Sequence, residues 1–141
     1  MAGTVVGTFT RVRTNVGRPK AAKLELLCTA DAALATYPST IINDLAALKS
    51  LWDLRGMMLK SLMAIPSAVV APTDKVNITI KNEYGVDLLG GAGTQFIPAA
   101  GSAWTKGTLY PVLITGDITM TLTDNLVNSA VITLVLELVG T

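Results

Sequence analysis

The chain has 141 residues, of which 50% are hydrophobic and only 15% are charged, and its formal net charge is +1. This length fits one domain that can bury a core without disulfides or metals, and the single cysteine excludes an internal disulfide. No apolar run reaches the roughly 18 residues that a membrane-spanning helix needs. Because globular proteins average about 25% charged residues, we expect part of the apolar surface to face outward.

The first thirty residues alternate with a period of two, which predicts strands with one buried face. We expect strands over residues 4–13 and 22–30, with turn material (TNVGRPK) between them. The alternation places Cys28 on the buried face, where it would be a small core residue. The opening residues do not match a signal peptide, because Arg11 and Arg13 follow the apolar residues. We therefore expect the chain to stay in the compartment where it is made.

The N-terminal segment, about residues 1–21, is predicted to be a basic arm, since five basic residues precede or border the first acid, Glu25. We take these residues as candidate contacts to an acidic protein surface or to nucleic acid; the alternative is a solvated strand and loop. Phe9 is the only aromatic residue before Tyr37, so base stacking has no support and nucleic acid is not the expected partner. The five residues are Arg11, Arg13, Arg18, Lys20 and Lys23.

Residues 38–56 break the period-two pattern, because their apolar residues recur at helical spacing. Ser39 or Thr40 is available as an N-cap. We expect one short helix here. An irregular excursion between strands is the alternative, since Asn43 and Asp44 also suit a turn.

The rest of the chain returns to strand patterns rich in threonine, valine and isoleucine. A fold with seven or eight strands, frequent turns and one helical segment is an all-β, jelly-roll-like antiparallel β-sandwich, here a single domain over residues 1–141. An α/β nucleotide fold would need repeated strand and helix alternation, which is absent. The further strands are expected at residues 55–67 (ended by Pro66), 75–82, 108–115, 116–124 and 129–140, with a hairpin-like connection at 125–128.

The strand at 55–67 is apolar on both faces, because GMMLKSLM carries methionine and leucine at odd and even positions. One face is therefore a candidate partner contact, through Met57 and Met58. Burial on both faces between a sheet and a helix is the alternative.

Residues 82–96 (NEYGVDLLGGAGTQF) hold four glycines behind a strand, which raises the question of a phosphate-binding loop. The third glycine of a dinucleotide motif falls on Phe96, and no Gly-Lys-Ser/Thr follows. We instead predict a short strand at VDLL and structural turns or close chain approach at Gly85, Gly90, Gly91 and Gly93.

No catalytic or metal-binding constellation stands out. The chain has no histidine, and each aspartate sits beside turn residues or a strand end, where it ordinarily caps or is solvated. We expect no enzyme activity, no cofactor and no metal.

Residues 71–138, from APTDKVNITIKNEYGVDLLGGAGTQF to the strand pair near the C-terminus, resemble small β-rich proteins encoded among the head genes of tailed bacteriophages. In those proteins a strand leads through a D-x-Y-G-V-D-x-L-G-G-A-G-like segment to a C-terminal hairpin. Asn82 occupies the usual acidic place here. The resemblance implies a virion structural protein, similar to capsid cement or decoration proteins of short-tailed phages.

The resemblance further implies the major capsid protein as partner and the virion shell as location. We expect a homo-oligomer, with a dimer preferred over a trimer. Another virion component, such as a head fibre base, tail part or receptor-binding module, is the alternative, with Trp104 as a residue for glycan stacking. An enzyme or carbohydrate-binding domain of cellular origin is a third, weaker alternative.

Overall fold

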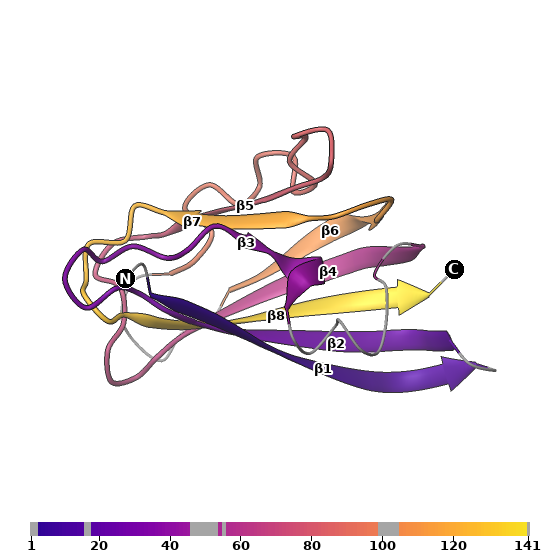
Figure 1. Cartoon of the computed structure of the whole chain (residues 1–141), viewed down its shortest axis with the longest axis horizontal. Coiled ribbons are helices and arrows are strands. Elements are labelled where there is room, and N and C mark those ends of the chain that lie inside the picture. The colour runs from indigo at the N-terminus through magenta and orange to yellow at the C-terminus, as the bar shows by residue number, and fades with distance from the viewer. Residues whose placement is uncertain (1–2, 16–17, 46–53, 55, 99–104, 141) are drawn as a thin grey trace.

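The computed structural model describes residues 3–15, 18–45, 54, 56–98 and 105–140. It is all-β, with two antiparallel sheets packed face to face, as Figure 1 shows. The elements in chain order are β1 (Thr4–Asn15), β2 (Arg18–Thr29), β3 (Thr40–Ile41), the 3₁₀ turn η1 (Ile42–Asp44), β4 (Met57–Pro66), β5 (Asn77–Lys81), β6 (Thr105–Leu113), β7 (Thr119–Thr123) and β8 (Val131–Gly140).

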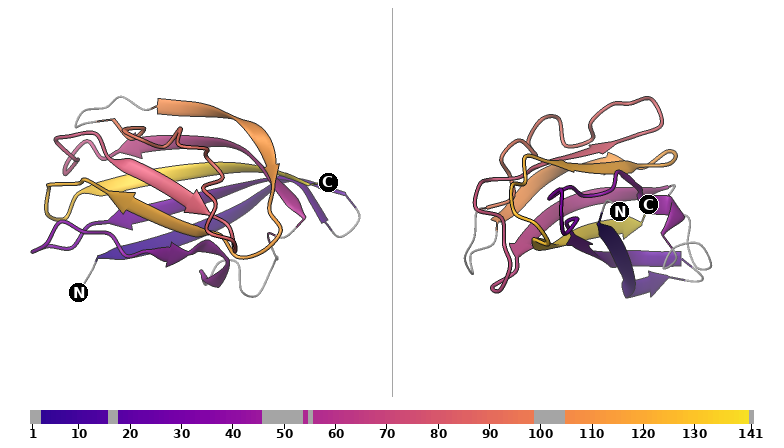
Figure 2. Two further views of the ribbon diagram at one scale, coloured as in Figure 1. Left: turned by 90° about the horizontal axis from the view of Figure 1, so that it is seen from above. Right: turned by 60° about the vertical axis from the view of Figure 1, so that its left-hand side comes forward.

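The large sheet has five strands in the order β1-β2-β8-β4-β6, and the small sheet has three in the order β3-β7-β5. From β3 onward, each strand lies in the other sheet from the strand before it. This wrapping of the chain around two sheets is that of a jelly roll. Seen from above, the strands of the small sheet lie across the large sheet (Figure 2, left). The predicted fold class is therefore confirmed.

The core lies between the two sheets and follows from the period-two pattern. On β2, the even-numbered residues from Ala22 to Cys28 are buried, and the same parity is buried on β8 from Ile132 to Leu138. The small sheet contributes Ile78, Ile80, Met120 and Leu122 from the opposite side. The expectation that Cys28 is a core residue is confirmed, since its side chain is fully buried.

The helix expected within residues 38–56 is wrong over its described N-terminal part. Thr40 lies in β3, the N-cap of η1 is Ile41 without a side-chain cap, and the chain is already extended again at Leu45. Hydrogen bonds to the start of β7 explain the difference: Asn43 Oδ1 accepts from Ile118 N–H at 3.0 Å, and Ile42 N–H donates to the Ile118 carbonyl at 2.9 Å. Residues 46–53 and 55 lie outside the described ones.

Two predicted connections and one predicted short strand also differ from the structure. Residues 14 and 15 and 18–20, expected to be turn, continue β1 and β2 as far as the pair Asn15–Arg18. Pro19 is tolerated there because the pairing of β2 with β8 starts only at Ala21, so its missing N–H breaks no second ladder. Residues 125–128 are not a hairpin, since β7 and β8 lie in different sheets. The short strand expected at VDLL is a turn with one isolated bridge, Lys81–Asp87.

Candidate interaction surface

The register of the large sheet brings the predicted basic and methionine contacts to the same end of that sheet. Arg13 pairs with Ala21 of β2, and Ala21 pairs with Val139 of β8. Val139 in turn pairs with Met58 of β4, and Met58 with Leu113 of β6. One row of backbone positions thus runs across all five strands, from the basic hairpin to an exposed leucine.

The structure builds the basic segment into the sheet as an edge hairpin. Arg11 and Arg13 lie in β1, and Arg18 and Lys20 lie at the start of β2. The structure describes the backbone of residues 11–15 and 18–20 and not their side chains, so the directions of these four side chains lie outside the described part. Their role as partner contacts stays a prediction.

Met57 and Met58 face opposite sides of the large sheet. Met57 is buried in the core and is only 5% exposed, so the proposal that it contacts a partner is wrong. Met58 is half-buried on the outer face, by which we mean the face of the large sheet turned away from the small sheet. Because β4 is apolar on both faces, its sequence alone does not show which methionine points outward. The pairing of β4 with β8 determines which face each methionine occupies.

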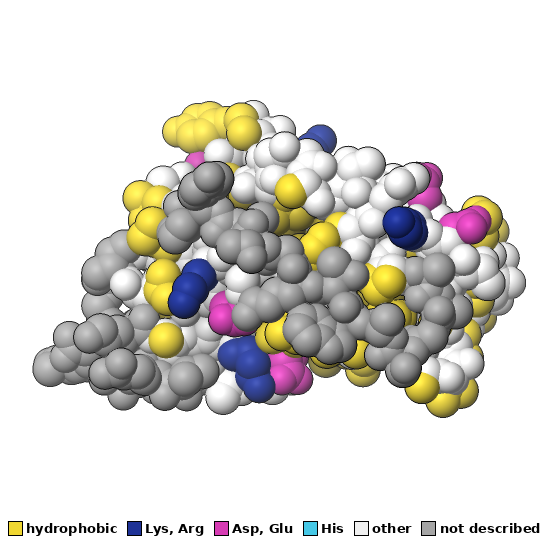
Figure 3. Space-filling view, turned by 180° about the vertical axis from the view of Figure 1, so that it is seen from behind, with side chains coloured by type: hydrophobic (Ala, Val, Ile, Leu, Met, Phe, Trp, Pro, Cys, Tyr) yellow, Lys and Arg dark blue, Asp and Glu magenta, His cyan; other side chains and the backbone are white. Residues whose placement is uncertain are grey.

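The outer face holds a groove of about 420 Å³ across β2, β8 and β4. No described strand packs on this face, which Figure 3 shows in part, with basic and acidic side chains close together and hydrophobic ones beside them. Its floor is apolar at the centre, where Val135 of β8 lies opposite Met63 of β4. The lining residues are Ala21, Ala22, Lys23, Glu25, Lys60, Met63, Val135, Glu137, Leu138 and Val139.

The charges around this groove are mixed in sign. Lys23, one of the predicted basic contacts, forms an ion pair with Glu25 at 2.9 Å, and both side chains are about two-fifths exposed. Such an exposed pair contributes at most about 1 kcal/mol to stability. Lys60, at the irregularity of β4, is exposed. The groove therefore offers an apolar floor with polar margins, an arrangement typical of protein interfaces.

Ser61 lies beside this groove and is unusual, because its hydroxyl is buried and has no hydrogen-bond partner among the described residues. In the register it stands opposite Glu137 of β8, on the outer-face side of β4. A buried hydroxyl without a partner costs stability.

Three loops at one end of the sandwich form a second exposed apolar region, which we call the loop end. Leu34, Val69 and Leu126 are 70%, 90% and 70% exposed, and each belongs to a different loop. Asn125 Nδ2 donates to the Ala35 carbonyl at 2.8 Å and so joins the loops of Leu126 and Leu34. The loop of Val69 is held to the start of β8, where Val131 N–H donates to the Val70 carbonyl at 2.9 Å. The loops gather at the left of Figure 1.

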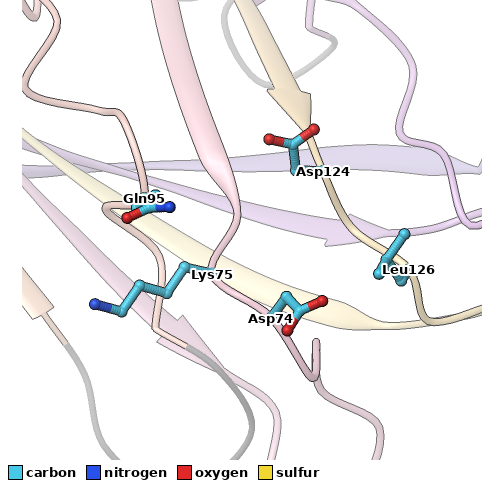
Figure 4. A pocket seen from close by; sticks show the side chains of 5 residues that line it. All are labelled: Asp74, Lys75, Gln95, Asp124 and Leu126. Atoms are coloured by element: carbon cyan, nitrogen blue, oxygen red, sulfur yellow. The ribbon is translucent and has the colours of Figure 1, made fainter.

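A polar pocket of about 500 Å³ lies beside the loop end and is drawn in Figure 4. Its lining residues are Asp74, Lys75, Gln95, Asp124 and Leu126. Asp124 accepts a hydrogen bond from Asn77 Nδ2 at 2.5 Å, and Asn77 Oδ1 accepts from the backbone N–H of Gln95 at 2.6 Å. Among the described residues, no three His, Cys, Asp or Glu side chains are placed to hold a metal ion.

Asp31 organises the first of the loops at the loop end. Its Oδ1 accepts hydrogen bonds from the backbone N–H groups of Ala33 and Leu34, each at 2.8 Å. These bonds favour the ionised carboxylate and lower the pKa of Asp31 below its ordinary value. Its backbone carbonyl accepts from Ala35 and Ser129, so the same residue ties two loops together.

Tyr37 and Cys28 are the buried titratable groups of the core. Tyr37 Oη donates to the Ala130 carbonyl at 3.0 Å, and burial, followed by the nearby Cys28, raises the pKa of Tyr37. Burial raises the pKa of the Cys28 thiol to about 12. A thiol held in its protonated form is a poor nucleophile.

The glycine-rich segment serves as turns and close contacts. Gly85, Gly90 and Gly91 have positive φ values of 78°, 60° and 83°. Gly93 is different, because a β-carbon there would overlap the backbone of Ile78. Asp87 fastens the loop: its Oδ1 accepts from the N–H groups of Ile80 and Leu89, and its Oδ2 from that of Gly91. The tip of the preceding turn exposes Tyr84 and Val86.

No protein-family model matches this sequence, and no curated protein matches it either. Among solved structures, a chain from the cyanophage Pam1 capsid asymmetric unit is similar. It shares 11% sequence identity and a TM-score of 0.39, with 100% of this chain and 88% of that chain covered. A likeness of this degree leaves both family and function open.

Sequence reasoning missed the loop end. The available signal was the presence of single apolar residues within turn-rich segments, such as Leu34 in DAALATYP and Leu126 in DNLVNS. Trp104, the residue considered for glycan stacking, lies outside the described residues. No helix in the described part of the chain is long and apolar enough to cross a membrane.

Proposed function

We propose that this protein is a non-enzymatic structural component of a phage virion that binds the major capsid protein and cements the head shell. The observation that carries the proposal is the outer face of the large sheet, on which no described strand packs, with its apolar-floored groove across three strands. Surfaces of this kind mark protein interfaces. The resemblance of residues 71–138 to phage head proteins supplies the class of partner.

The loop end supports the same proposal from a second direction. Leu34 and Leu126 project from loops that are hydrogen-bonded to each other, and Val69 projects from a loop that is hydrogen-bonded to the start of β8 at the same end of the sandwich. A protein that bridges two neighbouring shell subunits needs two separate contact regions, and the outer face and the loop end provide them. The described charges of the groove are mixed in sign and the described side chains that define the loop end are apolar, which is unlike the dense positive charge of a surface that binds nucleic acid.

The mechanism of cementing is mass action. A protein that binds the assembled shell and not the free subunits stabilises the shell by its binding free energy at each site. A hundredfold excess of free protein over its dissociation constant gives about 2.7 kcal/mol per site. Because the sites repeat over the shell, a modest affinity per site is sufficient.

Empty phage shells that lack this protein provide the test. We expect saturable, stoichiometric binding of the purified protein and a higher melting temperature of the shell. Met58→Lys places a charge in the outer face and is expected to weaken binding at least tenfold, with Thr123→Lys on the small sheet as the control. Circular dichroism must first show that both variants are folded.

Two results would overturn the proposal. One is an absence of binding to shells at concentrations where the protein is folded. The other is binding that leaves the melting temperature of the shell unchanged. The protein would then attach to the shell without stabilising it, and a role in a fibre or tail would be favoured.

A further inference from the structure

Strand β1 forms one edge of the large sheet, and along the side away from β2 it has no described partner strand. In the described part of the chain it pairs with β2 alone. Natural proteins usually protect such an edge by shortening it, charging it or inserting proline. Residues 4–10 (TVVGTFT) carry no charge and no proline, and they are rich in residues that favour strands. More than half of this 12-residue strand is therefore an unprotected template for another strand.

Charge begins only further along β1. Arg11 and Arg13 flank a register shift in the pairing with β2. Bulges and positive charges are both features that stop edge pairing. The regular, uncharged stretch that can accept a partner strand thus runs from Thr4 to Thr10.

Apolar side chains along this edge are incompletely buried on both faces of the sheet. On the outer face, Val6 is 58% exposed and pairs with Leu27, which is 47% exposed. On the inner face, Val5 and Phe9 pack against the core but are only half-buried. A further strand beside β1 would cover all of these side chains at once.

We propose that β1 pairs antiparallel with β1 of a second copy of this chain, across a two-fold axis at Gly7. In this register Phe9 stands opposite Val5 of the second copy on the inner face, and Val6 stands opposite Thr8 on the outer face. Aromatic and β-branched residues form favourable cross-strand pairs. The two large sheets join into one continuous sheet, with both small sheets on the same side.

The positions of the charged residues favour a second copy of this chain as the partner strand, paired in this register. Each Arg11 lies opposite Gly3 of the other copy, and each Arg13 lies beyond the paired stretch, so the basic residues of the two copies are at opposite ends. An in-register parallel alignment of the two β1 strands would place each arginine beside the same arginine of the other chain, and like charges at such positions are destabilising. An axis at Thr8 would place Arg11 opposite the half-buried Val5. The axis at Gly7 avoids both conflicts.

This dimer does not depend on the proposed role in a virion, and it is tested without shells. Light scattering of the purified full chain is expected to give twice the chain mass of 14.7 kDa. The double variant Val6→Lys with Thr8→Lys places lysines opposite each other twice and is expected to raise the dissociation constant of the dimer at least about tenfold. Thr123→Lys is the control and leaves the dimer intact.

Charge reversal tests the register. Val6→Lys chains mixed with Thr8→Glu chains place a lysine opposite a glutamate and are expected to form mixed dimers. Cysteine cross-linking gives a second test. Thr4→Cys with Thr10→Cys is expected to link two copies under mild oxidation, whereas Val6→Cys with Thr10→Cys, which suits an axis at Thr8, is not. The native Cys28 is fully buried, so we expect it to form no cross-links of its own.

A monomer at all accessible concentrations would overturn the proposal. A dimer that is insensitive to the lysine pair would show a different interface. Cross-linking only through the Val6→Cys with Thr10→Cys variant would refute the axis at Gly7.

Discussion

The backbone of Gly93 lies against the backbone of Ile78, with no room for a side chain between them. Ile78 N–H donates a hydrogen bond to the Gly93 carbonyl at 2.9 Å, and a β-carbon on Gly93 would overlap the Ile78 carbonyl oxygen. This contact attaches the glycine-rich segment to the edge of the small sheet at β5. The segment is thereby part of the fold and not an appended loop.

Gly93→Ala is therefore expected to destabilise the protein by about 3 kcal/mol, since the backbone must move to relieve the overlap. Gly90→Ala is the matched control. Gly90 also lies in this segment, but a β-carbon there would have no atom within 4 Å, and only the positive φ of 60° opposes the substitution. That cost is about 1–2 kcal/mol. Urea unfolding of both variants measures the difference, and equal losses would contradict the contact.

Asp31→Asn is expected to reduce stability at pH 7 and to make stability less dependent on pH in acid. Backbone hydrogen bonds from Ala33 and Leu34 lower the pKa of Asp31 below its ordinary value of 3.8. A lowered pKa contributes stability that is fully present above the ordinary value and is lost as the pH falls through the folded-state pKa. Chemical unfolding at pH 7 and at pH 3 tests this, with Asp117→Asn as an exposed control. A constant difference between Asp31→Asn and the parent across that range would refute it.

Ser61→Ala is expected to leave stability unchanged or to raise it by up to about 1 kcal/mol, because it removes a buried hydroxyl that has no partner. Ser67→Ala is the contrasting variant. The hydroxyl oxygen of Ser67 accepts from Val69 N–H at 3.1 Å, so its removal should cost about 0.5 kcal/mol or less at this exposed site. Thermal unfolding distinguishes the two. A marked loss of stability in Ser61→Ala would show that this hydroxyl does have a partner.

Cys28 is expected to be unreactive toward thiol reagents in the folded protein at pH 8. Its side chain is fully buried, and its pKa is raised to about 12, so almost no thiolate is present. Reaction should proceed only through unfolding and should accelerate with urea in parallel with loss of structure. Rapid labelling under native conditions would contradict this placement of β2.

The strands were predictable because one face of each is buried and the other is not. That asymmetry gives β2 its alternation from Ala22 to Cys28, and the same period is visible in β5 and β7. Where both faces are apolar, as in β4, the sequence could not tell Met57 from Met58. The missing information is the register with β8, which depends on residues more than 70 positions away.

Other errors have the same long-range origin. The helix expected after Ser39 does not form over its described part, because residues of η1 make hydrogen bonds with Ile118 instead. Strand β3 has only two residues, which is too short for a recognisable period-two pattern. The exposed leucines of the loop end became a surface only because Asn125 joins two loops that are far apart in sequence. Local propensity predicts elements, whereas a surface composed of several loops requires the fold.

The position of β8 in the middle of the large sheet has a consequence for synthesis. β2 and β4 are both neighbours of β8 and not of each other, so the sheet remains in two parts until residues 131–140 have been made. Until then the ribosome-bound chain exposes the apolar edges of both parts. Folding that waits for such distant pairings is slow, so we expect the nascent chain to depend on chaperones, and low temperature during expression should increase the yield of folded protein.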